Sequence, residues 1–126
     1  IDFGLARVGL ALASPIAKLP RPLKIVENNP SLVESIQDII KQEGISLIVV
    51  GLPRDQQGRQ TAQTEATIKF IDTLASKVDV PVQTVDESLS SVRADAAAKD
   101  IKGREQIRHN DDLAACFILD TYLGRF

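Results

Sequence analysis

The sequence lacks the features that would place a protein outside the cell or in a membrane. Its one cysteine, Cys116, has no second cysteine to pair with, which favours a reducing compartment and a small buried side chain. No apolar run approaches the roughly 18 to 20 residues of a membrane span, and no signal peptide is recognisable. We therefore expect a cytoplasmic protein that does not interact with membranes.

Methionine is also absent, and the sequence begins within a pattern typical of a strand. We therefore expect that residues before Ile1 are missing and that the first strand is truncated at this end. The length of 126 residues suits one domain with a single core. Hydrophobic residues make up 44% and charged residues 25% of the chain, which is ordinary for a globular protein. Residues 1–126 are expected to form one domain.

Positive charge is not in excess, since the net charge is −2 and the isoelectric point is near 5.4. This balance argues against a protein that coats nucleic acid. One segment is locally basic and contains Lys99, Lys102, Arg104, Arg108 and His109. The acids within this segment favour a solvated surface. Its position directly before Asp111 and Asp112 favours a local contact with phosphates, so both alternatives stay open.

Strand and helix patterns alternate along the chain and predict an α/β layered domain. Strands are predicted at residues 7–14, 23–26, 45–50 and 81–85, after a first strand that ends near Asp2. Helices are predicted from residue 29 or 30 to 43, and at residues 61–77, 89–99 and 111–123. This order describes a mixed sheet that begins with a hairpin and continues with parallel crossovers.

Glycine, asparagine and proline mark several boundaries of these elements. Gly4 is predicted to take a positive φ in the turn after the first strand. Asn29 and Pro30 are predicted to be the cap and the first residue of a helix, and Gly44 is predicted to end it.

Three of the predicted helices have an apolar face with helical spacing. In the helix that ends at residue 43 this face contains Leu32, Val33, Ile36, Ile39 and Ile40. In the helix at 61–77 this face contains Ile68, Ile71, Leu74 and Ala75. In the last helix it contains Ala114, Ala115, Ile118, Leu119, Tyr122 and Leu123. Asp111 lies within the face of the last helix, Asp112 lies at its edge, and Asp120 is predicted to point to solvent.

Acidic residues occur at three separated places beside apolar elements. Asp2 is in IDFG, Asp86 and Glu87 end VPVQTVDE, and Asp111 and Asp112 begin NDDLAACFIL. Ionised carboxylates in such positions need partners, and the three places could converge on a divalent metal. Adjacent residues of a strand point to opposite faces, so only one of Asp86 and Glu87 would join such a site. A turn for Asp2 and helix caps for the others are the structural alternatives.

These motifs, in this order, resemble the YqgF family of RuvC-like Holliday junction resolvase relatives. The resemblance is carried by IDFGLARVGLALAS, VVGLP with Gly58, VDESLSSV and NDDLAACFILDTYL. It implies a ribonuclease H-like three-layer fold with a mixed central sheet of about five strands flanked by helices. It also implies that Asp2, Glu87 and Asp111 are catalytic acids and metal ligands, and Asp112 is a further candidate ligand.

The resemblance further implies a nuclease that processes the 5′ end of precursor 16S ribosomal RNA in the bacterial cytoplasm. Carboxylates suit Mg²⁺ or Mn²⁺, and two such ions about 4 Å apart can act on one phosphodiester. The expected partner is nucleic acid, either precursor RNA or branched DNA, with a pre-ribosomal particle as a further candidate. Either a monomer or a homodimer is expected. Candidate phosphate contacts are Arg7, Arg54, Arg59, Lys102, Arg104 and Arg108.

Other functions are compatible with parts of the sequence. IDFGLAR is similar to the start of a protein-kinase activation segment, but no kinase catalytic loop or nucleotide-binding lobe accompanies it. Actin-like and sugar-kinase ATPases share the order of elements but normally close two such domains on a nucleotide. A DNA junction resolvase and a non-catalytic ribosome-assembly or nucleic-acid-binding module remain alternatives.

Overall fold

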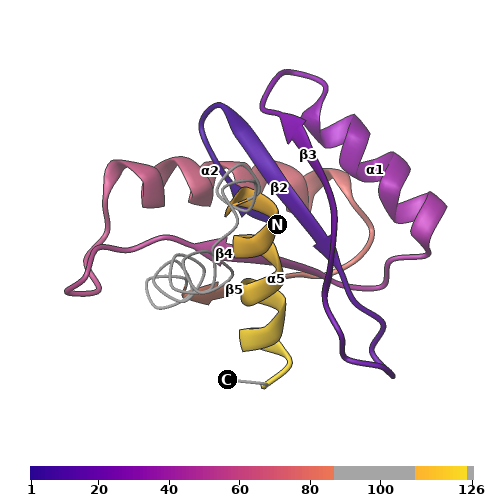
Figure 1. The fold of residues 1–126 in the computed structure, drawn as a ribbon. Helices are drawn as coiled ribbons and strands as arrows, with labels where there is room; N and C mark the ends of the chain where they lie inside the picture. The colour runs from indigo at the N-terminus through magenta and orange to yellow at the C-terminus, as the bar shows by residue number, and fades with distance from the viewer. Residues whose placement is uncertain (87–109, 125–126) are drawn as a thin grey trace.

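The computed structural model describes residues 1–86 and 110–124, with the backbone alone for residues 110–112. The described elements, in chain order, are β1 (Asp2–Phe3), β2 (Arg7–Leu12), β3 (Arg21–Glu27), α1 (Leu32–Glu43), β4 (Ile48–Leu52), α2 (Ala62–Lys77), β5 (Val82–Asp86) and α5 (Asn110–Tyr122) (Figure 1). The predicted order of strands and helices is confirmed over these ranges, and the class is mixed α/β. The helix predicted at residues 89–99 lies outside them.

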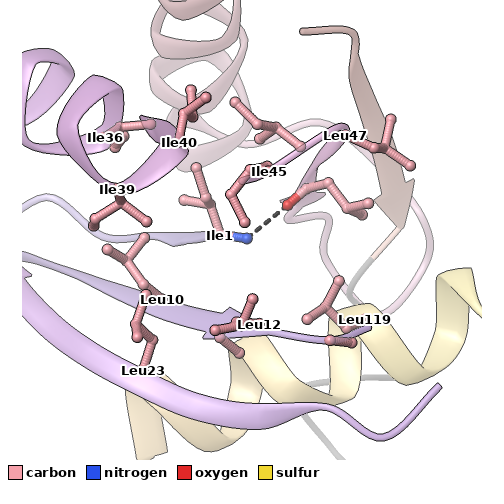
Figure 2. Close-up of a pocket in the computed structure, with 14 residues that line it drawn as sticks. Ile1, Leu10, Leu12, Leu23, Ile36, Ile39, Ile40, Ile45, Leu47 and Leu119 are labelled. Carbon is pink, nitrogen blue, oxygen red and sulfur yellow. Dashed lines mark hydrogen bonds between the residues drawn. The ribbon is translucent and has the colours of Figure 1, made fainter. Parts of the chain in front are cut away.

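The strands form two sheets in the described part of the chain. β1, β2 and β3 are antiparallel neighbours, as the predicted initial hairpin requires, and β4 pairs with β5 in parallel. Two backbone hydrogen bonds join the sheets at Ile1. Its nitrogen donates to the Val49 oxygen at 2.6 Å, and the Gly51 nitrogen donates to the Ile1 oxygen at 3.0 Å. Figure 2 shows the first of these bonds as a dashed line.

The turn between β1 and β2 needs a glycine for a reason that differs from the predicted one. Gly4 does not have a positive φ, so that prediction is wrong. A Cβ atom at Gly4 would instead collide with the carbonyl oxygen of Arg7. The side chain of Asn28 donates to the Gly4 oxygen at 2.8 Å, and the Asn28 nitrogen donates to the Ala6 oxygen at 3.0 Å. The turn is therefore held close against the end of β3, where a side chain at Gly4 has no room.

Helix α1 begins two residues later than Pro30, which corrects the predicted start. The Asn29 side chain accepts from the Ser31 nitrogen at 2.9 Å, so Asn29 forms a turn of its own before the helix. The predicted end is confirmed, because Gly44 has a φ of 65° and its nitrogen bonds to the Ile40 oxygen. Strand β4 then begins at Ile48, three residues after the predicted start, and its first four residues are buried as expected.

The inward face of α2 is rotated relative to the prediction. The buried residues of this helix are Thr64, Thr67, Phe70 and Leu74. Ile68 and Ile71 are half-buried, but Ala75 is exposed, so its predicted inward position is wrong. The ring of Phe70 stacks on that of Phe3, with centroids 4.4 Å apart and planes 19° apart. This contact with β1 directs the Phe70 side of α2 towards the core.

The main core lies between the sheets and the helices α1 and α2. It contains Phe3, Val8, Leu10, Leu32, Ile36, Ile48, Val50, Phe70 and Leu74. Helix α5 packs on the strands from the other side, mostly against β2 and β3. Figure 1 shows α5 in front of β4, while α2 passes behind β2. Gly9 and Ala11 alternate with Val8 and Leu10 along β2, so the face towards α5 carries small residues. The sheets thus lie between two helical layers.

Part of the predicted inward face of α5 is confirmed. Ala115 and Ile118 are fully buried, and Cys116 is half-buried. Tyr122 is 41% exposed and Asp120 is half-buried, so both of these predictions are wrong. The end of α5 extends past the strands in Figure 1, so the last turn has less of the sheet to pack on. Within residues 1–86 and 110–124, no helix combines the length and apolar character needed to cross a membrane.

An apolar pocket of about 100 Å³ lies at the start of β1 (Figure 2). Ile1 lies in it, with Leu10 and Leu12 of β2 on one side and Ile45 and Leu47 on the other. All the side chains that line it are apolar. It therefore offers no side-chain ligand for a metal or a phosphate.

Candidate functional site

Asp2 is the first sequence-predicted site residue, and its neighbours determine where it points. Phe3 packs into the core against Phe70, and the Phe3 oxygen accepts a hydrogen bond from the Gln63 side chain at 2.8 Å. Adjacent residues of a strand point to opposite faces. The half-buried Asp2 therefore points to the face of the strands that α5 covers.

Two glycines flank Asp2 on that face. Gly9 of β2 is its antiparallel partner, and Gly51 of β4 is its neighbour on the other side, because the Gly51 nitrogen bonds to the oxygen of Ile1. Both glycines are buried. Neither glycine places a side chain beside Asp2, and a carboxylate is a ligand type that Mg²⁺ and Mn²⁺ accept.

Helix α5 brings the third acidic pair to the same side of the molecule. Asn110 is its first residue, so Asp111 and Asp112 stand in the first turn of a helix that packs against β1 and β2. Glu87, the remaining predicted catalytic acid, lies outside the described residues. Among the residues that the structure does describe, no cluster of three or more histidine, cysteine or acidic side chains could hold a metal.

The sequence predicts a metal ligand or a helix cap at Asp86, whereas the structure shows an ion pair. Its Oδ1 lies 2.7 Å from Nε of Arg54, so it forms an ion pair. In the β4–β5 register Asp86 is opposite Leu52, and Ile48 opposite Val82 faces the core. By alternation Asp86 belongs to the core side of the sheet, opposite to Asp2.

The two arginines of the β4–α2 loop are both engaged in ion pairs. Arg54 holds Asp86 and also donates from Nη1 to the Gly58 oxygen at 3.4 Å. Nε of Arg59 lies 2.9 Å from Oδ2 of Asp55, and the Arg59 side chain is 72% exposed. The sequence reasoning missed Asp55 and both pairs, although the spacing of four between Asp55 and Arg59 was a usable signal.

Asp55 closes this loop and has a lowered pKa. Its Oδ1 accepts from the Arg59 backbone nitrogen at 2.8 Å and from the Gln57 nitrogen at 2.9 Å. The bond from the Arg59 backbone is the largest cause of the lowered pKa; partial burial opposes it, and the Arg59 guanidinium and Gln57 nitrogen add to it. Gly58, with a φ of 79°, completes the turn.

The other predicted phosphate contacts are only partly covered by the structure. Arg7 is exposed at the first residue of β2. The basic segment with Lys99, Lys102, Arg104, Arg108 and His109 lies outside the described residues.

Comparisons with known proteins cover nearly the whole chain. The model of the family described as "RuvX: Holliday junction resolvase" matches residues 1–125. A relative from Sulfurihydrogenibium sp. is 35% identical over 127 residues, which is 99% of this chain and 88% of the relative. One from Maridesulfovibrio salexigens is 36% identical over 129 residues, covering 99% and 96%. One from Chloroflexus aurantiacus is 33% identical over 130 residues, covering 98% and 83%. All three carry the name "Putative pre-16S rRNA nuclease".

Proposed function

Because the chain belongs to the RuvX family of Holliday junction resolvases, also called YqgF, we propose that it is a nuclease that processes the 5′ end of precursor 16S ribosomal RNA. The family expected from the sequence motifs is thereby confirmed, and the names of the relatives favour RNA over branched DNA. The observation that carries the proposal is the position of Asp2. It lies between Gly9 and Gly51 on the face that α5 covers, and Asp111 is in the first turn of α5.

We propose Asp2, Glu87 and Asp111 as the catalytic acids and metal ligands, with Asp112 as a further ligand. Carboxylate oxygens are the donors that Mg²⁺ and Mn²⁺ prefer. When bound, two such ions would activate water and stabilise the leaving oxygen of the phosphodiester. Asp86 belongs to the core side of the sheet, opposite to Asp2. Of the adjacent pair Asp86 and Glu87, we therefore propose Glu87 as the ligand.

The fold in this proposal is ribonuclease H-like, with one mixed sheet in the order β3-β2-β1-β4-β5. The two hydrogen bonds of Ile1 to Val49 and Gly51 support it, because they have the pattern of a parallel pair between β1 and β4. We also propose that residues 1–126 form one domain.

Contacts with the substrate are proposed for exposed cations. Arg7 and Arg59 are exposed at the start of β2 and in the β4–α2 loop. Lys102, Arg104 and Arg108 complete the proposed set of phosphate contacts. We place the protein in the cytoplasm, where it would meet a pre-ribosomal particle either as a monomer or as a homodimer.

The test of this function is cleavage of end-labelled precursor 16S RNA and of a four-way DNA junction, with Mg²⁺, Mn²⁺ or a chelator. The variants are Asp2→Asn, Glu87→Gln and Asp111→Asn. Each should lower the rate of RNA cleavage by more than the roughly 10–100-fold typical of residues that only orient a metal ligand. Asp38→Asn, an exposed acid on α1, is the matched control and should cut like the wild type.

Three results would change the conclusion. A clear preference for the DNA junction would make the protein a resolvase. Tight binding of RNA without cleavage would make it a non-catalytic assembly module. Cleavage that persists in the chelator, or that is equal in all variants, would overturn the proposed acids.

A further inference from the structure

Strand β1 has a gap in its hydrogen bonding to β4. Ile1 bonds to β4 twice, through its nitrogen to the Val49 oxygen and through its oxygen to the Gly51 nitrogen. In a parallel pair such bonds repeat every second residue, so the next donor of β4 belongs to residue 53 and would meet the oxygen of Phe3. Residue 53 is a proline, which has no N–H to donate. Bonds between the two strands therefore cannot satisfy the Phe3 oxygen.

Gln63, in the first turn of α2, supplies the missing donor. Its Nε2 donates to the Phe3 oxygen at 2.8 Å, across 60 positions of sequence. Phe3 is 9% exposed and Gln63 is half-buried, so water is a poor substitute for this donor. A buried carbonyl that loses its partner raises the free energy of the folded state. The bond from Gln63 thus completes the end of β1 in a way that β4 cannot.

The turn of α2 that carries Gln63 is itself fixed. Thr61 and Thr64 form the capping box that starts the helix, and the Thr64 hydroxyl donates to the oxygen of Pro53. The hydroxyl of Thr67 donates to the Gln63 oxygen at 2.8 Å. One helical turn is therefore attached both to the end of β1 and to the residue after β4. Gln63 donates to Phe3 from a preorganised support.

The bond acts on the backbone of β1, so it affects both faces of the strand. The side chain of Phe3 packs into the core on Phe70, and Asp2, the residue before it, belongs to the opposite face. β1 consists of Asp2 and Phe3 alone, and a strand of two residues has few ladder bonds to fix its position. Movement of the Phe3 peptide would carry the Asp2 backbone with it.

We propose that Gln63 is a positioning residue for Asp2. It donates to the Phe3 oxygen where β4 has no N–H, and it thereby holds the end of the strand that carries the Asp2 carboxylate. The inference rests on the proposed role of Asp2 as a metal ligand.

Amide hydrogen exchange in chelator tests the hold on β1 without any metal. Gln63→Met keeps the length of the side chain but has no donor, so the Gly51 amide, which bonds to Ile1, should exchange about 10-fold faster. The comparison is made relative to the amide of Leu74, in the buried part of α2, which reports opening of the whole domain. An unchanged ratio of the two rates would overturn the proposal.

Gln37→Met is the matched control for this exchange. The Nε2 of Gln37 also donates to a backbone oxygen at 2.8 Å, but that oxygen belongs to Lys77 and the bond joins α1 to the end of α2. The control loses a bond of the same kind away from β1, so the exchange of Gly51 should stay at the wild-type rate. Equal acceleration in both glutamine variants would show that the effect is general and would contradict the role of Gln63.

Calorimetric titration with Mn²⁺ tests whether Gln63 acts through Asp2. Gln63→Met should raise the dissociation constant for Mn²⁺ by about 10-fold or more, whereas Gln37→Met should not change it. Asp2→Glu keeps a carboxylate but changes its reach, and it should also weaken binding. Because Gln63 would act only by placing Asp2, adding Gln63→Met to Asp2→Glu should weaken binding little further. Effects that multiply would mean that the two residues act independently, and the proposal would fall.

A rescue experiment examines the missing ladder donor directly. Pro53→Ala restores a backbone N–H opposite Phe3, so the double variant with Gln63→Met should recover part of the Mn²⁺ affinity and of the Gly51 protection. Pro53→Ala alone is the reference for the effect of losing the proline ring. No recovery in the double variant would show that Gln63 does not replace a β4 donor.

Failure of the inference differs from failure of the function. With RNA at saturating Mn²⁺, Gln63→Met should lower kcat and leave KM little changed, because it displaces a ligand rather than a substrate contact. If Asp2→Asn stops cleavage while Gln63→Met matches the wild type in cleavage and Mn²⁺ binding, the positioning role is wrong and the nuclease stands. If Asp2→Asn cuts and binds Mn²⁺ as the wild type does, the proposed role of Asp2 fails, and the inference fails with it.

Discussion

The described carboxylates differ chiefly in what surrounds them. Asp55 accepts hydrogen bonds from two backbone nitrogens and is paired with Arg59. Asp86 is paired with Arg54 on the core side of the sheet. Asp2 lies between two glycines on the side of α5. The same functional group thus closes a loop, pairs with an arginine at a strand end and provides a candidate metal ligand. The neighbouring residues determine which of these partners a carboxylate can bind.

The loop carboxylate gives a prediction about pH. Because the folded pKa of Asp55 is lowered, its ionised form stabilises the fold above the ordinary aspartate pKa of about 3.9 and this contribution is lost as the pH falls through the lower folded pKa. Asp55→Asn should therefore be less stable than the wild type at pH 7, and the difference should shrink below about pH 4. Urea unfolding of both proteins from pH 7 to pH 2.5 measures it. A difference that stays constant over this range would show that the charge is not the cause.

Among the elements, α2 shows how a helix start ties distant segments together. Thr61 and Thr64 form a capping box, in which the Thr61 nitrogen donates to Oγ1 of Thr64 at 2.9 Å. The Thr64 hydroxyl also donates to the Pro53 oxygen at the end of β4. One buried hydroxyl therefore satisfies the start of α2 and fixes the segment that carries Arg54.

Loss of that hydroxyl should destabilise the whole domain. Thr64→Val leaves the Thr61 nitrogen and the Pro53 oxygen without this partner, at a cost of about 1–3 kcal/mol in the free energy of unfolding. Thr64→Ser keeps the hydroxyl and should recover most of that loss, while Thr73→Val, on an exposed position of the same helix, should change it by less than about 0.5 kcal/mol. Urea denaturation at pH 7 gives the three values. Equal losses for valine and serine would assign the effect to packing rather than to the hydrogen bonds.

For the whole molecule, the candidate site depends on the close approach of α5 to the strands. The side of β2 towards α5 carries Gly9 and Ala11, and Ala115 of α5 is fully buried. These small residues let the helix pack closely on the strands, with Asp111 in its first turn. The candidate site therefore depends on the separation of two layers as much as on its acids.

A larger residue at this contact should separate the layers. Ala115→Leu is expected to lower the free energy of unfolding by about 1–3 kcal/mol, because a buried position has no room for the added atoms. Ala75→Leu is the matched control, since Ala75 is exposed on α2, and it should change stability by less than about 0.5 kcal/mol. Chemical denaturation compares them. If Ala75→Leu were the more damaging variant, the rotation of α2 described above would be wrong.

Local chemistry let the sequence determine much of this protein. Gly44 ends α1 and Thr61 precedes α2 because a left-handed glycine and a capping threonine satisfy backbone groups within a few residues. The hairpin, the parallel crossover and the buried strand β4 follow from side-chain period alone, and the motifs with their acids sufficed to identify the family. The assignment of Glu87 to the metal site stays a prediction.

Only the tertiary structure decided which partners these residues meet. Helical spacing gave α2 an apolar face that included Ala75, but the stacking of Phe70 on Phe3 rotated the buried face towards Thr64 and Thr67. The pairing of Asp86 with Arg54 joins residues 32 positions apart, and the lack of room at Gly4 comes from the carbonyl of Arg7. Local pattern specifies conformation, whereas ion pairs and close contacts depend on how the elements pack in three dimensions.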